Sequence, residues 1–205
     1  CSKISPKGEI EVKDVTVENF TKLNLKGDFK VFFAKGNQNL VSVETYPNVY
    51  KNLDIEVENG ILTIEENRKT EQVDFYNITI FGKNDLNEVS LSDKVEMNVS
   101  GQVKTPEFLL HLKGNSKFMG AIIAPKSKIE MAEKSNANIL GETKNLNLKL
   151  ADSASIMAPY FYVENLEILS QNGASAGLNI DQEMKGTLEN TSKLIFYGEP
   201  LNKLT

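Results

Sequence analysis

The chain has 205 residues, with 28 acidic and 23 basic side chains, a net charge of −5, 40% apolar residues and 25% charged residues. This composition is that of a globular chain of one or two domains, and it excludes a disordered or collagen-like protein. No segment approaches the roughly 20 consecutive apolar residues of a membrane-spanning helix, so no such helix is expected.

The residue types restrict the function further. Arg68 is the only arginine, so the planar fork that reads phosphates and guanine is almost absent, and the lysines are interspersed with glutamates. Nucleic-acid binding is therefore not expected. His111 is the only histidine and Cys1 the only cysteine, which excludes zinc sites built from clusters of these residues. We expect no metal site and no cofactor.

The first residue is a cysteine, followed by a polar run over residues 2–8. A cysteine in this position is typical of a mature bacterial lipoprotein, in which acyl chains on the thiol and the amine anchor the chain to a membrane. We expect lipid attachment at Cys1 and a tether over residues 1–9, with the membrane contacted through the lipid only. The alternative is a chain boundary that happens to fall on a cysteine.

The first part of the chain alternates between apolar and polar residues with a period of two, and helical spacing is scarce. Short strands rich in β-branched and aromatic residues are predicted at 10–12, 15–17, 23–25, 29–33 and 41–43. Residues 53–58 and 61–64 flank Asn59-Gly60, a dipeptide that tolerates positive φ and closes a tight hairpin. A polar loop at 65–71 and a strand at 75–81 follow. The sequence predicts an all-β protein.

After residue 83 a repeat appears, in which a strand, a short polar turn and a small residue recur. The equivalent strand positions are Leu91, Leu112, Met131, Leu150, Ser170 and Leu188, with steps of 21, 19, 19, 20 and 18 residues. A unit of this length buries too few side chains to fold alone, so stacking must stabilise it. The sequence predicts a parallel β-helix of about six coils over 83–205, with a capping β region over 10–82.

Two sets of residues are expected at the turns of the coils. Small residues form one inward column at the bend: Ser116, Ser135, Ala154, Ala174 and Ser192, with Val95 in the first unit. Residues that tolerate the left-handed conformation suit the tight turns: Asn115, Asp152, Asn172 and Asn190. The alternative fold is a β-sandwich whose turns recur about every ten residues.

Several of these segments resemble the head GIN domain family. The similarity is carried by residues 20–31, the hairpin at 57–64, the serial strand and turn units and the terminal Tyr197-Gly198-Glu199-Pro200, and it covers residues 15 to 200. The family's repeated Ser-Gly-Ser-Gly turn is matched only by Lys113-Gly114-Asn115-Ser116. The resemblance implies a right-handed β-helix, exposure at the bacterial outer membrane or cell surface, and an adhesin without catalytic residues.

The first functional hypothesis is a non-enzymatic binding module that presents a rigid β-helix to glycans or proteins. Exposed aromatic rings would bind, because rings stack on sugar faces and anchor protein contacts. Tyr160 and Tyr162 must point to one side of their strand and Phe161 to the other, so we name Tyr160, Tyr162 and Tyr197 as candidate ligand-binding residues. The alternative is that these rings only fill or cap the solenoid.

Two other functions stay open. A polysaccharide-acting enzyme would need paired carboxylates or an acidic cluster beside a base, for which the candidates are Asp152, Asp181, Glu183, Lys149 and His111. A purely structural role would use the open end of the solenoid for self-association into a homo-oligomer.

Overall fold

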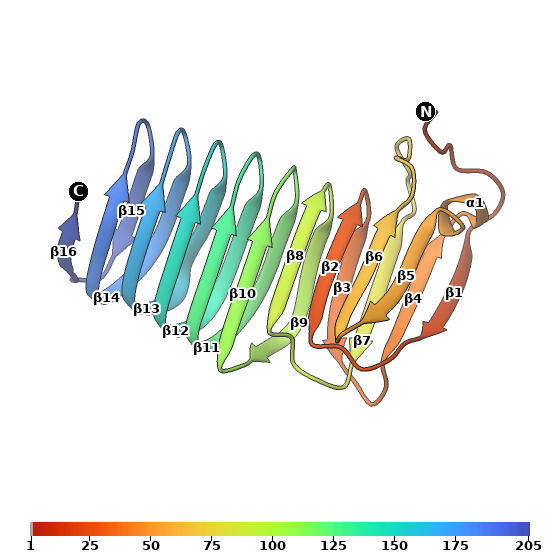
Figure 1. The fold of residues 1–205 in the computed structure, drawn as a ribbon, viewed down its shortest axis with the longest axis horizontal. Coiled ribbons are helices and arrows are strands. Elements are labelled where there is room, and N and C mark those ends of the chain that lie inside the picture. The colour runs from red at the N-terminus through yellow and green to blue at the C-terminus, as the bar shows by residue number, and fades with distance from the viewer. Residues whose placement is uncertain (1) are drawn as a thin grey trace.

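The chain folds as a right-handed parallel β-solenoid with a flattened cross-section (Figure 1). The computed structural model describes residues 2–205. In Figure 1 each coil runs up one strand in front, through a tight turn, and down a second strand behind. We call these two layers the front sheet and the back sheet. Coils pair through parallel ladders, which rules out the antiparallel layers of a sandwich.

The elements before the repeat are β1 (Glu11–Thr16), β2 (Lys22–Gly27), β3 (Lys30–Lys35), β4 (Leu40–Thr45), α1 (Pro47–Tyr50), β5 (Leu53–Glu58), β6 (Ile61–Glu66) and β7 (Asn77–Gly82). The repeat contains β8 (Glu88–Asp93), β9 (Glu96–Lys104), β10 (Glu107–Leu112), β11 (Lys117–Met131), β12 (Asn136–Leu150), β13 (Ser155–Ser170), β14 (Ser175–Leu188), β15 (Lys193–Tyr197) and β16 (Leu201–Leu204). The long strands β11 to β14 begin in the back sheet, cross a bend and end in the front sheet.

The predicted repeat is confirmed residue by residue in the front sheet. Leu112 pairs with Leu91 on one side and with Met131 on the other, and the same register continues through Leu150, Ser170 and Leu188. These side chains point into the core because every second residue of a strand faces inward. The stacked apolar columns supply the burial that a single coil lacks.

The small residues form the predicted column in the turn between the sheets. The backbone amides of successive coils bond to the carbonyls of Val95, Ser116, Ser135, Ala154 and Ala174, which places these residues in line. All five of these residues are fully buried. The hydroxyls of Ser116 and Ser135 donate back to the turn carbonyls of Lys113 and Ala132 at 2.8 and 2.7 Å, so their burial leaves no unpaired polar group.

One residue in each tight turn takes the left-handed conformation, as predicted for Asp152, Asn172 and Asn190. The prediction for Asn115 is wrong, because Gly114 takes that position with φ 68°. A Cβ at Gly114 would lie 2.8 Å from the carbonyl oxygen of Asp93 in the coil before it, so glycine removes a clash there.

The parallel stack extends into the N-terminal region but does not follow chain order. β2 lies between β8 and β6 in the front sheet, and β3 lies between β9 and β7 in the back sheet. Residues 61–82 therefore form a coil outside the coil of residues 22–35. Parallel pairing crosses the predicted boundary between residues 82 and 83.

Antiparallel strands cover the N-terminal end. β5 pairs with β6 through the predicted hairpin, in which Asn59 and Gly60 have φ of 51° and 76°. β4 and then β1 add antiparallel strands beyond β7. The short helix α1 packs at the same end and was not predicted (Figure 1).

The described part of the predicted tether lies against this capped end. The amide of Ile4 donates to the carbonyl of Lys69 and its carbonyl accepts from the amide of Glu71, both at 2.9 Å. The guanidinium of Arg68 donates to Ser2. Cys1 lies outside the described residues, so its lipid attachment stays a prediction.

Candidate functional site

The outer surface of the back sheet carries exposed large apolar side chains on four of its strands, β11, β12, β13 and β15. In β11 to β13 these side chains alternate with buried core residues along the strand. The set consists of Met119, Leu140, Met157, Tyr160, Tyr162, Ile195 and Tyr197. We call this set the apolar stripe. Single exposed hydrophobic residues are common, but several large ones gathered on one face typically mark an interaction surface.

The ladder register explains how these side chains fit beside one another. Met119, Asn138, Met157, Gly177 and Ile195 occupy the same position in five successive coils of the back sheet. Large apolar residues therefore alternate with asparagine or glycine along the stack. A Cβ on Gly177 would lie 3.3 Å from the sulfur of Met157, so the thioether leans over the space that glycine leaves.

The three predicted tyrosines all lie on this surface. Tyr160, Tyr162 and Tyr197 are 64%, 55% and 54% exposed, whereas Phe161 is fully buried, as the alternation predicted. Tyr160 pairs with Leu140 of the previous coil. Asn179 pairs with Tyr162 on one side and Tyr197 on the other, so these two rings stand two coils apart, about 10 Å at 4.8 Å per strand.

The strand that carries Tyr160 and Tyr162 is irregular at this point. The ladder between β13 and β14 shifts register between Ala158 and Tyr162, where Pro159 lacks an amide donor. The Pro159 carbonyl accepts a hydrogen bond of 3.3 Å from the side-chain amide of Asn179 in the next coil. A bulge redirects side chains relative to the neighbouring coil, and here it leaves Tyr160 paired with Leu140 of β12 but without a partner in β14.

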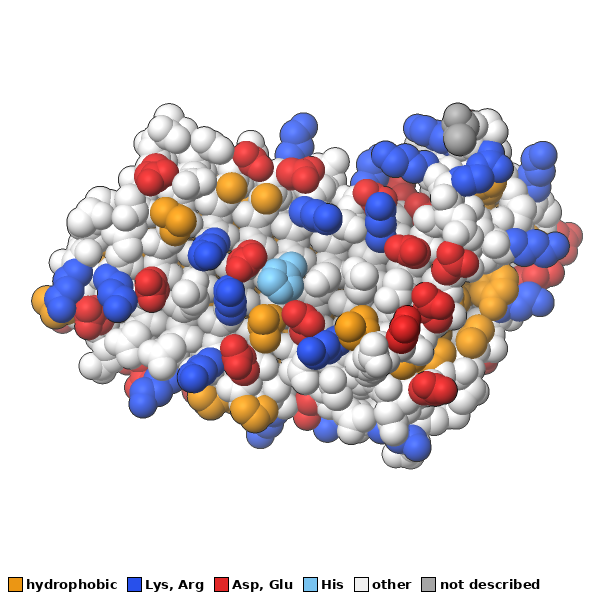
Figure 2. Space-filling model, viewed as in Figure 1, with side chains coloured by type: hydrophobic (Ala, Val, Ile, Leu, Met, Phe, Trp, Pro, Cys, Tyr) orange, Lys and Arg blue, Asp and Glu red, His pale blue; other side chains and the backbone are white. Residues whose placement is uncertain are grey.

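The outer surface of the front sheet is charged instead. Lysines and carboxylates are mixed on this face, with few hydrophobic side chains between them (Figure 2). The imidazole of His111 lies 3.6 Å from the carboxylates of both Glu88 and Glu130, and Lys128 lies 3.4 Å from Glu130. The two His111 contacts join neighbouring coils, whereas Lys128 and Glu130 lie on the same strand, β11. Solvent-accessible pairs of this kind contribute little to stability.

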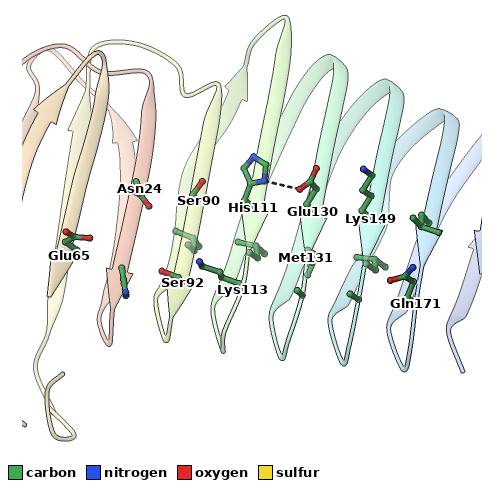
Figure 3. Close-up of a pocket in the computed structure, with 17 residues that line it drawn as sticks. Asn24, Glu65, Ser90, Ser92, His111, Lys113, Glu130, Met131, Lys149 and Gln171 are labelled. Carbon is green, nitrogen blue, oxygen red and sulfur yellow. Dashed lines mark ion pairs between the residues drawn. The ribbon is translucent and has the colours of Figure 1, made fainter. Parts of the chain in front are cut away.

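A groove of about 680 Å³ runs across the front sheet along the solenoid axis (Figure 3). Ser90, His111, Glu130 and Lys149 stand side by side there because they share one register position on successive coils. The groove is lined by positively charged, negatively charged and neutral polar side chains, and its lining residues include no phenylalanine or tyrosine on which a sugar ring could stack.

The candidates for an enzymatic site lie in separate places. Asp152 sits in a turn, where its carboxylate accepts from the amide of Glu133 at 3.0 Å and from the side chain of Asn172 at 3.2 Å. Glu183 pairs with Lys203 at 3.3 Å. Asp181 lines a different groove, at the bend beside Tyr162, together with two glutamates, Glu142 and Glu164. Lys149 and His111 line the front groove.

The carboxyl group with a shifted pKa lies inside the N-terminal end and on neither outer face. Burial raises the pKa of Glu66 above its ordinary value, although hydrogen bonds from Tyr76 at 2.9 Å and Thr70 at 3.1 Å favour the ionised form. Burial and the adjacent Glu66 carboxylate raise the pKa of Tyr76 in turn. The cluster joins the end of β6 to the loop that leads from β6 to β7.

The last two observations on the site concern residues 2–205, the part of the chain that the structure describes. No group of three or more histidine, cysteine, aspartate or glutamate side chains there could hold a metal ion. Within the same range, no helix has the length and apolarity needed to cross a membrane.

The fold and its surfaces define the class: a right-handed β-solenoid that presents an apolar, aromatic face on one sheet and a charged face on the other. The chain belongs to the family described as "Putative auto-transporter adhesin, head GIN domain", whose model matches residues 19–200. This confirms the resemblance seen in the sequence. No curated protein matches the chain.

Solved structures share the fold at low sequence identity. A "putative adhesin" from Bacteroides fragilis matches with a TM-score of 0.80 and 16% identity, over 98% of this chain and 100% of that chain. A "putative adhesin" from Parabacteroides merdae matches with a TM-score of 0.69 and 14% identity, over 100% and 98%. A "putative lipid binding protein" from Parabacteroides distasonis has a TM-score of 0.66 and 17% identity, with full coverage of both chains.

Sequence reasoning named the tyrosines of the stripe and missed its other members, Met119, Leu140, Met157 and Ile195. The signal was available, because an inward column was predicted for each coil and the residues directly before and after an inward position face outward. Applying that alternation to the predicted back strands would have shown apolar residues at outward positions.

Proposed function

We propose that the protein is a non-enzymatic adhesion module of the bacterial cell surface that binds an extended glycan chain along the apolar stripe. The observation that carries this proposal is the exposure of three tyrosines among apolar side chains on one rigid sheet. Flat aromatic rings stack on the apolar faces of sugars while their hydroxyls bond to sugar hydroxyls.

The spacing of the stripe supports a chain-like ligand. Successive coils are about 4.8 Å apart, which is close to the length of one sugar ring in an extended polysaccharide. Tyr162 and Tyr197 stand two coils apart on the same column, with the amide of Asn179 between them. A glycan lying along the solenoid axis could therefore stack on both rings and bond to the amide side chain.

Attachment at the cell surface forms the second part of the proposal. A lipid on Cys1 would anchor the chain in the outer membrane, with the membrane contacted through the lipid alone. The described residues 2–7 lie at the capped end, and the stripe extends toward the opposite end (Figure 1). An anchor there would leave the stripe pointing away from the membrane. Mass spectrometry of the protein purified from membranes tests for acyl chains on Cys1, and an unmodified thiol would contradict this part.

A glycan array with the chain of residues 1–205 tests the binding proposal. The parent is expected to bind extended glycans, and the double variant Tyr160→Ala/Tyr162→Ala is expected to lose that binding. The matched control is Glu130→Ala/Lys149→Ala, which removes two exposed side chains from the front groove and should bind like the parent. An array on which the parent binds nothing would overturn the proposal.

The non-enzymatic part has its own readout. The glycan that binds best is incubated with the protein, and reducing ends and unsaturated products are measured over time. We expect none. Their appearance would support the enzyme alternative and direct attention to the bend groove of Glu142, Glu164 and Asp181.

A further inference from the structure

We infer that the C-terminal coil is a self-association surface, and that a second copy of this chain pairs with it end to end across a twofold axis. The inference starts from the edge of β15. This strand pairs with β14 only, so within residues 2–205 its outer edge has no strand beside it. Unpaired edges of this kind are templates for another strand.

The last coil exposes side chains that earlier coils bury. Leu178 is fully buried, yet its counterpart Phe196 in β15 is 39% exposed because no coil within residues 2–205 covers it. Leu194 and Leu204 are only partly buried for the same reason. The end of the solenoid therefore presents core side chains beside an unpaired backbone edge.

The two edges of this end differ. In β16 the amide of Leu204 is already satisfied by the side chain of Asn202 at 3.0 Å. Among the described residues, no side chain does this for β15. The amide of Lys193 points to β14, where it bonds to the Ala174 carbonyl, so those of Leu194 and Phe196 point to the open edge. The free donors and acceptors thus concentrate on β15.

A comparison with the other end indicates which surface of the second copy fits. The outermost strand there, β1, carries Glu11, Lys13 and Asp14, and charged residues of this kind protect an edge from pairing. β15 has a single charge, at Lys193, and Ile195 at its centre is 64% exposed. The partner of β15 is therefore β15 of a second copy.

An antiparallel register centred on Ile195 pairs all five residues of β15. Leu194 then lies opposite Phe196 of the second copy, and their edge-facing amides and carbonyls can bond to each other. Lys193 lies opposite the partner's Tyr197, so each charged side chain of the strand faces an uncharged residue. The two Ile195 side chains meet at the axis.

This arrangement has a functional consequence. A twofold axis perpendicular to the sheets keeps both back sheets on the same side, so the two apolar stripes become continuous across the junction. One glycan chain could then bind to both copies, and linked sites raise the overall affinity without new contacts.

The test is sedimentation of the parent chain and of Ile195→Lys over a range of concentrations. The parent should form a species of twice the 22.8 kDa chain mass. Ile195→Lys should weaken dimerisation at least about tenfold, because it places like charges directly opposite each other. Met119→Lys is the matched control, since Met119 occupies the same column away from the end, and it should dimerise like the parent.

A charge-swap mixture separates pairing from misfolding. Ile195→Lys and Ile195→Glu should each be monomeric, and an equal mixture of the two should restore the dimer. A parent chain that stays monomeric at millimolar concentration, a dimer that is indifferent to Ile195→Lys, or assemblies that grow beyond two copies would each overturn the inference.

Discussion

The outer surfaces of the two sheets belong to the same coils and rest on the same core, yet one is apolar and aromatic whereas the other is charged. In the back sheet, Met119, Met157 and Ile195 point to solvent from one column; in the front sheet, the equivalent outward column contains His111, Glu130 and Lys149. The fold requires apolar residues only at inward positions.

The outward positions are therefore free to serve other purposes. Charged side chains there keep a surface solvated, and each costs the fold little. Exposed tyrosine, methionine and isoleucine add nothing to the core and raise the tendency to aggregate, so their clustering on one face indicates a binding surface. Substitutions at inward and outward positions should therefore differ in their effect on the free energy of unfolding.

The largest effect is expected from the aromatic residue between the two exposed tyrosines. Phe161→Ala should lower the free energy of unfolding by about 3–5 kcal/mol, because it leaves a cavity in the stacked core. Tyr160→Ala and Tyr162→Ala should each change it far less, since both rings are more than half exposed. Urea denaturation of the three variants measures this, and similar losses in all three would contradict the assignment of inward and outward positions.

A smaller change of opposite sign is expected in the core beneath the front sheet. Ser170 occupies a column of leucines and methionine. Its hydroxyl oxygen is the one buried side-chain nitrogen or oxygen atom within residues 2–205 that has no hydrogen-bond partner. Ser170→Ala should raise the free energy of unfolding by about 1 kcal/mol, because it removes an unsatisfied polar group. Ser127→Ala is the control: its hydroxyl donates to Thr143 at 2.9 Å, so its loss should destabilise the fold.

Glu66 provides a pH-dependent contrast with the exposed carboxylates of the front sheet. Burial raises its pKa above the unfolded value, so the folded state binds the proton more readily. The free energy of unfolding should therefore fall as the pH rises from the ordinary glutamate range through the raised pKa. Glu66→Gln keeps an oxygen acceptor for Tyr76 and Thr70 and should remove this part of the slope. Denaturation over a pH series measures it, and parallel slopes in both proteins would contradict the prediction.

The smallest effect is expected on the front sheet itself. His111→Ala removes the contacts to Glu88 and Glu130 but should change the free energy of unfolding by less than about 1 kcal/mol, because exposed pairs are screened by solvent and salt. Denaturation at low and high salt measures this. A larger loss would mean that the charged ladder holds the coils together.

The repeat was predictable because each coil carries its own evidence of register. Leu112, Met131 and Leu150 recur at nearly equal steps, and the small residues Ser116 and Ser135 recur at a fixed phase after them. Stacking requires both, since inward columns must match from coil to coil. The turn at residue 114 was misassigned by one position because glycine and asparagine both tolerate the left-handed conformation.

The order of the N-terminal coils was not predictable from the same pattern. β2 pairs with β8 and β3 pairs with β9, although these strands lie far apart in the sequence. The sequence repeat of about twenty residues does not include β2 and β3, so it could not predict these pairs. Alternation shows that a strand has an inward face, but it does not select which neighbour pairs with it. The contacts of residues 2–7 with residues 68–71 were hidden for the same reason, since they depend on how that end is assembled.

The binding face is tested most directly by calorimetric titration of the strongest array glycan into three proteins. For the parent and for Glu130→Ala/Lys149→Ala, equal affinities are predicted. For Tyr160→Ala/Tyr162→Ala, we predict a loss of at least about tenfold, which corresponds to about 1.4 kcal/mol. The opposite pattern, with affinity lost in the front-sheet variant and kept in the tyrosine variant, would contradict the assignment of adhesion to the back sheet.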